Sequence, residues 1–249
     1  MKMKKIFIIG VCSIIAFVSC KKDFDGRTAE DANLIQTSFV RFYAGSLGAA
    51  RNFISVDNQR LNGSSLAMGG VFPGASTLTA FATIAPGNRS ISIVDSAAVP
   101  AQTPLTFSQN FLAGQYYTIY SYDTSNKVKA LVVNDIINIP TDTTCNLKFV
   151  NIIYSSLPVT PTVNVDVFSR SRQANIFSNV APLGVSAVIP HRTAVTDTLD
   201  IRVAGTTTIL TSINGFTFNQ RRNYTLVFRG LYQATLGTMS RGAGIIATY

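Results

Sequence analysis

The sequence predicts an all-β protein: two tandem immunoglobulin-like antiparallel β-sandwich domains that follow a cleaved lipoprotein signal. Three observations lead to this prediction. An apolar N-terminal run ends at a cysteine, apolar residues alternate with polar ones without a helical period, and similar strand landmarks recur 107 residues apart. About seven short strands in roughly a hundred residues, with turn signals between them, are typical of an immunoglobulin-like sandwich.

The first element is the N-terminal signal. Three lysines precede an apolar run over residues 6–18, which Ser19 and Cys20 follow. The run is too short for a membrane-spanning helix, which needs about 20 apolar residues. A small residue directly before a cysteine resembles the lipobox cut by the lipoprotein signal peptidase. We therefore predict removal of residues 1–19 and lipidation of Cys20, which anchors the chain in a membrane.

Charge and composition restrict the partners. The formal net charge is +9, and removal of the signal with its three lysines leaves +6. The dense basic spots, 170–172 and 221–222, fall in predicted turns, and we interpret them as solvent-exposed turn residues. The alternative is that they attract anionic polysaccharide or lipid headgroups. Nucleic acid is disfavoured as a partner, because an exported lipoprotein would not meet the genome and the chain has no recognition motif.

Two internal copies define the domains. Val40-Arg41-Phe42-Tyr43 matches Leu147-Lys148-Phe149-Val150, and Tyr117 matches Tyr224 at the same offset of 107 residues. Alternation of apolar and polar residues predicts strands packed on one face, and parallel sheets are excluded for want of crossover helices. The predicted parts follow the chain in order: signal peptide 1–19, tether 20–36, first sandwich 37–139, joint 140–144 and second sandwich 145–249.

The residues also resemble a known family. The Ser-Cys-Lys-Lys-Asp sequence at 19–23 is similar to the lipobox region of many lipoproteins of Bacteroidota. The units that open at Val40 and Leu147 and carry Tyr-Thr pairs at Tyr117 and Tyr224 resemble a DUF4397-type domain of unknown function, in two tandem copies. The resemblance implies an all-β fold and a surface location, and it brings no catalytic residues.

No pattern in the sequence predicts an enzyme. Cys145 is the cysteine that remains when Cys12 is removed with the signal and Cys20 is lipidated. We interpret it as a small buried residue at the start of a strand rather than as a nucleophile. The sole histidine, His191, lies in a predicted loop and is a weak partner for it. Because no Gly-x-Ser-x-Gly elbow, phosphate loop, acid pair or calcium loop is evident, we predict neither a metal nor a cofactor.

One tyrosine row is the candidate binding site. If Tyr117 points inward, the period of two turns Tyr116, Tyr120 and Tyr122 outward on one face. Three exposed tyrosines would form a platform that can stack on sugar rings or anchor a protein. In the alternative interpretation, these side chains pack against the second copy or under a neighbouring loop.

These patterns predict a non-enzymatic lipoprotein of the outer membrane. The leading expectation is an accessory surface module that binds glycan or another polymer through Tyr116, Tyr120 and Tyr122. The alternative is a structural or adhesive protein that works through contacts with other envelope proteins, or by edge-to-edge pairing of its strands. The sequence leaves open the ligand, the side of the membrane and the oligomeric state.

Overall fold

The computed structural model describes residues 36–74, 81–99, 101–155 and 163–248. The predicted signal 1–19, the lipidation site Cys20 and all of the tether 20–36 except its last residue lie outside these ranges. The chain from residue 35 onward clusters into one compact unit. No strand of the described ranges enters the predicted joint at 140–144.

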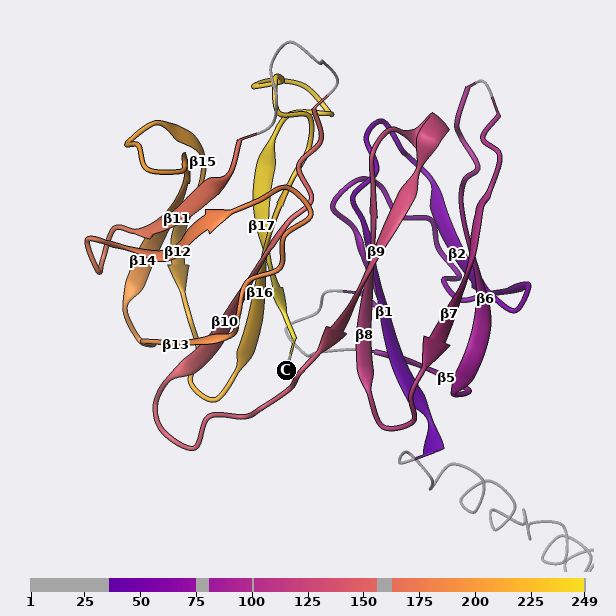
Figure 1. Ribbon diagram of the computed structural model, residues 1–249, viewed down its shortest axis with the longest axis horizontal. Helices are drawn as coiled ribbons and strands as arrows, with labels where there is room; N and C mark the ends of the chain where they lie inside the picture. Colours follow the sequence, from indigo (N-terminus) through magenta and orange to yellow (C-terminus); the bar gives the residue numbers. More distant parts are fainter. Residues whose placement is uncertain (1–35, 75–80, 100, 156–162, 249) are drawn as a thin grey trace, which may run out of the picture. The chain divides into compact units, whose positions relative to one another are not determined.

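Strands dominate the described chain, in agreement with the all-β prediction (Figure 1). The strands before the joint are β1 (Ser38–Ala44), β2 (Asn52–Val56), β3 (Gln59–Arg60), β4 (Val71–Phe72), β5 (Ala82–Ile84), β6 (Gly87–Asp95), β7 (Leu105–Phe111), β8 (Tyr116–Tyr122) and β9 (Lys129–Asp135). The strands after it are β10 (Cys145–Asn151), β11 (Val165–Ser169), β12 (Ala174–Val180), β13 (Ile189–His191), β14 (Thr196–Val203), β15 (Ile209–Thr217), β16 (Asn223–Arg229) and β17 (Gly242–Ala247). A short 3-10 turn (Ser125–Lys127) precedes β9.

The strands form four sheets, two from each repeat. In the first repeat, β4-β1-β8-β9 with β5 beside β1 faces β3-β2-β6-β7, and a core that includes Val40, Ile54 and Ile93 fills the space between them. In the second repeat, β13-β10-β16-β17 faces β12-β11-β14-β15 around Leu147 and Phe149. Each core joins residues of two sheets, which is the construction of a β-sandwich.

The two repeats share one strand register. Val40 lies opposite Tyr117 and Leu147 lies opposite Tyr224, so the predicted landmarks occupy equivalent places. Both pairs of strands are parallel, which corrects the expectation that parallel pairing is absent. No crossover helix is needed here, because the long connection between the paired strands runs through the second sheet of the same sandwich.

The strand order differs from that of a constant immunoglobulin domain. In that domain the first two strands are neighbours in one sheet. Here β1 and β2 lie in different sheets, as β10 and β11 do in the second repeat. The pairings therefore show antiparallel-dominated sandwiches without confirming the immunoglobulin-like connectivity.

The landmark tyrosines tie each sandwich to its preceding turn. Tyr117 and Tyr224 are buried in their cores, and each hydroxyl accepts a hydrogen bond from a backbone N–H five residues earlier, that of Leu112 and Asn219 respectively, at 3.1 Å. Such a contact closes a corner between consecutive strands, as a tyrosine does in many sandwiches. The core position and the hydrogen bond together explain why the same residue type stands at both places.

We expect Tyr117→Phe and Tyr224→Phe each to lower the free energy of unfolding by about 1 kcal/mol, because a part-buried hydrogen bond between the hydroxyl and a backbone N–H is lost. Chemical denaturation measures this loss. The control is Tyr122→Phe, since no hydrogen bond of the described residues involves the Tyr122 hydroxyl. Equal effects of all three substitutions would contradict this role of the corner hydroxyls.

Candidate functional site: the charge cluster between the inner sheets

The sheets that contain β1 and β10 are buried on both faces. One face of each lines its own sandwich core, and the other faces meet in a third apolar cluster. Its buried members are Tyr43, Tyr120, Val133, Val150, Ile152, Val227 and Ile246. The two repeats are thus packed sheet against sheet through an apolar layer, within the compact unit.

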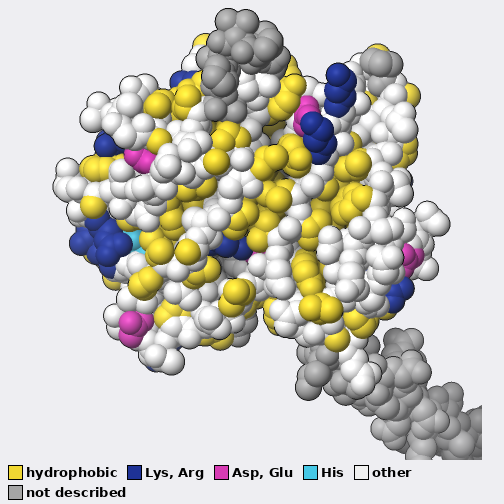
Figure 2. Space-filling model, viewed as in Figure 1, with side chains coloured by type: hydrophobic (Ala, Val, Ile, Leu, Met, Phe, Trp, Pro, Cys, Tyr) yellow, Lys and Arg dark blue, Asp and Glu magenta, His cyan; other side chains and the backbone are white. Residues whose placement is uncertain are grey.

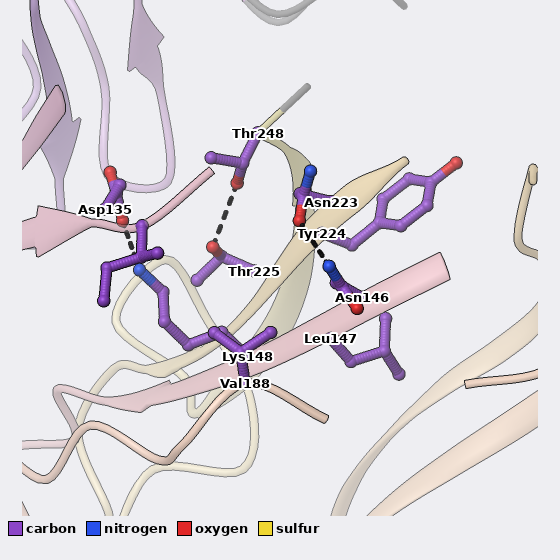
Figure 3. Close-up of a pocket in the computed structure, with 10 residues that line it drawn as sticks. Asp135, Asn146, Leu147, Lys148, Val188, Asn223, Tyr224, Thr225 and Thr248 are labelled. Carbon is purple, nitrogen blue, oxygen red and sulfur yellow. Dashed lines mark hydrogen bonds and ion pairs between the residues drawn. The ribbon is translucent and has the colours of Figure 1, made fainter. Parts of the chain in front are cut away.

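A buried group of charges lies in the same interface. The Asp135 carboxylate at the end of β9 accepts a hydrogen bond from Lys148 Nζ of β10 (Figure 3). It also accepts one from the Thr118 hydroxyl of β8. Arg41 Nη2 lies 3.5 Å from the same carboxylate and donates to Thr118 Oγ1 at 2.9 Å. Arg41 is 1% exposed and Asp135 2%, so two cations share one carboxylate away from solvent and the group keeps a net charge of +1.

Arg41 also reaches the second repeat. Its Nη1 donates to the Ala247 carbonyl oxygen at 3.1 Å, and its Nη2 lies 3.4 Å from Thr248 Oγ1. Thr248 in turn shares a hydrogen bond of 3.1 Å with Thr225. The guanidinium therefore bridges the two repeats in addition to balancing Asp135.

Equivalent positions of the two repeats build this cluster. Lys148 follows Arg41 by the repeat offset of 107, and Thr225 follows Thr118 by the same offset. Asp135 lies opposite Tyr116 on β8, and Thr248 donates its N–H to Asn223 O, the matching place on β16. Arg41 of the first repeat thus contacts Thr248 of the second, and Lys148 of the second contacts Asp135 of the first. These matched contacts make the interface nearly self-complementary.

The cleft beside this cluster is too small for an organic ligand. Its volume is about 10 Å³, and its walls include Asp135, Asn146, Lys148, Asn223 and Thr225 (Figure 3). This is room for roughly one water molecule. No group of three or more potential metal ligands occurs in the described part of the chain. The arrangement can hold two sheets together, but it cannot admit a substrate.

The predicted tyrosine platform is not exposed. Tyr120 is 0% exposed, because the outward face of β8 is covered by the inner sheet of the second repeat. Tyr122 packs at the margin of the same cluster. Tyr116 is half-buried and stacks on Phe39 at 4.5 Å between ring centroids. The period of two predicted the direction of these side chains correctly. The expected exposure was wrong, because the second copy covers Tyr120 and Tyr116 packs against Phe39 of its own repeat.

A second polar cluster forms at the far edge of the second repeat. Ser169 Oγ donates to Asp197 Oδ2 at 2.5 Å, and His191 Nε2 lies 3.8 Å from the same oxygen. His191 lies opposite Cys145 on the neighbouring strand. Sequence reasoning missed this grouping, because the residues come from three distant segments.

The geometry of this cluster is not that of a nucleophile and its base. The Ser169 hydroxyl donates to the carboxylate rather than to the imidazole, and Ser169, His191 and Cys145 are all buried. Burial raises the pKa of the Cys145 thiol to about 12, so it is protonated and unreactive at neutral pH. Cys145 is the small buried strand residue that the sequence predicted.

The outer surface of the described residues has a larger hollow and scattered charge. The hollow, of about 320 Å³, lies beside the β2–β3 turn, where Arg89 pairs with Asp57 at 3.1 Å. Positive side chains lie in several separate small groups on the face drawn in Figure 2. In the predicted basic turn, Arg170 forms an ion pair with Asp200 at 2.9 Å. The basic residues are thus dispersed and partly neutralised.

Comparisons with known proteins do not assign the chain to a family. No family model matches the sequence, and no curated protein matches it. The resemblance to a domain family of Bacteroidota lipoproteins stays a prediction. In the part of the chain that the structure describes, no helix has the length and apolar character needed to cross a membrane.

We expect Asp135→Asn to lower the free energy of unfolding by about 3–5 kcal/mol, because Arg41 and Lys148 then stay buried without a compensating charge. Urea denaturation at neutral pH measures this. Asp57→Asn is the matched control, since the Asp57–Arg89 pair is largely exposed and should matter little. Similar losses from both substitutions would contradict the central place of Asp135.

The buried histidine predicts acid sensitivity. Burial, and then the nearby Arg172, lower the pKa of His191 from its ordinary value of 6.5 to about 4. Between these values the unfolded chain binds a proton that the folded chain does not. Stability should therefore fall as the pH falls from 6.5 to 4, by up to about 3 kcal/mol, and should not depend on this group above that range.

Denaturation midpoints measured between pH 7.5 and pH 4.5 test this expectation. His191→Gln removes the titrating group, so its stability should change less with pH than that of the wild type, whatever its absolute value. Parallel pH profiles for the two proteins would show that His191 is not the group responsible.

Proposed function

We propose that this protein is a lipid-anchored, non-enzymatic protein of the outer membrane with a structural or adhesive role that it performs through contacts with other proteins. The observation that carries the proposal is the double-faced burial of the two inner sheets. The two repeats are joined through an apolar layer and the Asp135 cluster, so they act as one stiff body. A stiff body on a membrane anchor suits a spacer or a scaffold.

Glycan capture by the tyrosine row is the alternative function. It needs Tyr120 at the surface, whereas Tyr120 is enclosed between the repeats. Tyr116 and Tyr122 are only half-exposed and are separated along β8 by this buried residue. The structural role therefore accounts better for the packing of these aromatic side chains inside the protein.

The anchor is tested with Cys20→Ala in the bacterium that produces the protein. We expect the wild type to incorporate radiolabelled fatty acid and to fractionate with the outer membrane, because acyl chains on Cys20 hold it there. The variant should lose the label and leave the membrane fraction. A variant that keeps both label and location would contradict lipidation at Cys20.

The role itself is tested on intact cells with a short amine-reactive cross-linker, in parallel with a polysaccharide binding screen on residues 21–249. We expect discrete cross-linked protein adducts from the wild type and no saturable polysaccharide binding. The Cys20→Ala strain is the control for contacts that require the membrane location. Saturable binding to a polysaccharide, without protein adducts, would overturn the structural role in favour of glycan capture.

A further inference from the structure

Unpaired sheet edges offer backbone N–H and C=O groups to other strands, and natural proteins usually protect them by shortness, proline, charge, bulges or cover. Most edges of the described sheets carry such protection. Strands β3, β4 and β5 have two or three residues, and β13 contains Pro190. Strand β9 begins with Lys129 and ends with Asp135.

The remaining edges of the second repeat are also protected. Strands β12 and β15 have register shifts against their neighbours, and Gly215 of β15 has a φ of +62°. Strand β17 contains two glycines and lies beside β15, so the two edges cover one another. Irregular or covered edges accept an added strand poorly.

Among the described strands, β7 shows none of these protections. Its seven residues, Leu-Thr-Phe-Ser-Gln-Asn-Phe, include no charge, proline or glycine. All seven pair with β6 in an unbroken register, and β7 ends the sheet order β3-β2-β6-β7. Its sheet is the outer layer of the first repeat, on the side of the core opposite the Asp135 interface.

The side chains of β7 suit pairing with an identical strand. Thr106, Ser108 and Asn110 are exposed, and Leu105 and Phe107 are half-buried on the other face. In an antiparallel pair centred on Ser108, Thr106 faces Asn110 of the other copy. Exposed residues thereby meet exposed residues, and no like charges come together. Small polar side chains directly opposite each other stabilise such pairs.

We propose that β7 pairs antiparallel with β7 of a second copy of this chain, so that the two outer sheets become one continuous sheet. This inference rests on the proposed structural role and names its partner and its strand. Two lipid-anchored copies share a membrane surface, which raises their effective concentration, so a weak contact suffices.

Sedimentation equilibrium of residues 21–249, which include the whole compact unit from residue 35, tests the pairing. The concentration should extend to about 1 mM, because a single strand pair buries less area than a standard interface and binds weakly. We expect the wild type to form a concentration-dependent dimer. A wild type that stays monomeric throughout would overturn the inference.

Charge variants identify the strand. Ser108→Lys places like charges opposite each other at the centre of the pair and should weaken association at least tenfold. Ser178→Lys is the matched control on β12, a protected edge with an exposed serine, and should associate like the wild type. Unchanged melting temperatures show that both variants are folded.

Mixing two oppositely charged variants distinguishes a weakened strand pair from misfolding. Ser108→Asp alone should also be weakened, whereas an equimolar mixture of Ser108→Lys and Ser108→Asp should regain a dimer, because opposite charges then meet. No recovery, or a Ser108→Lys variant that dimerises like the wild type, would overturn the β7 pairing. If the β7 pairing fails but cross-linked adducts persist on cells, the inference is wrong and the proposed structural role stands.

Discussion

One carboxylate shared by two buried cations is the constraint on which the rest of the molecule depends. Asp135 is the acidic group that faces Arg41 and Lys148, and all three are shielded from water. Taking these charges out of solvent is costly, and the attraction and hydrogen bonds in the cluster offset that cost only while all partners stay in place. The cluster therefore ties the end of β9 to β1 of its own repeat and to β10 of the other.

The near symmetry of this interface explains why the sandwiches meet through their inner sheets. Arg41 and Lys148 hold equivalent positions, as do Thr118 and Thr225, so each repeat presents a similar face to the other. A two-fold interface in a homodimer has the same property. The repeats differ where Asp135 of the first corresponds to Thr248 of the second, and this difference supplies the one carboxylate that the two cations share.

The sequence predicted the strands and their inward faces, because a period of two reports which residues fill a sandwich core. Val40, Tyr117, Leu147 and Tyr224 lie in the cores as that pattern requires. It could not predict the second buried face. Arg41 and Lys148 resemble ordinary solvent-facing residues, and their burial depends on a contact between repeats that no local pattern encodes. The prediction that Tyr120 is exposed was wrong for the same reason.

Calorimetric unfolding of residues 21–249 tests most directly whether the repeats are one body. We predict a single transition whose calorimetric enthalpy equals its van't Hoff enthalpy, because neither repeat can unfold without exposing the apolar layer and the charges of the interface. Two separate transitions, each accounting for about half of the total enthalpy, would show that the sandwiches unfold independently and would contradict the account.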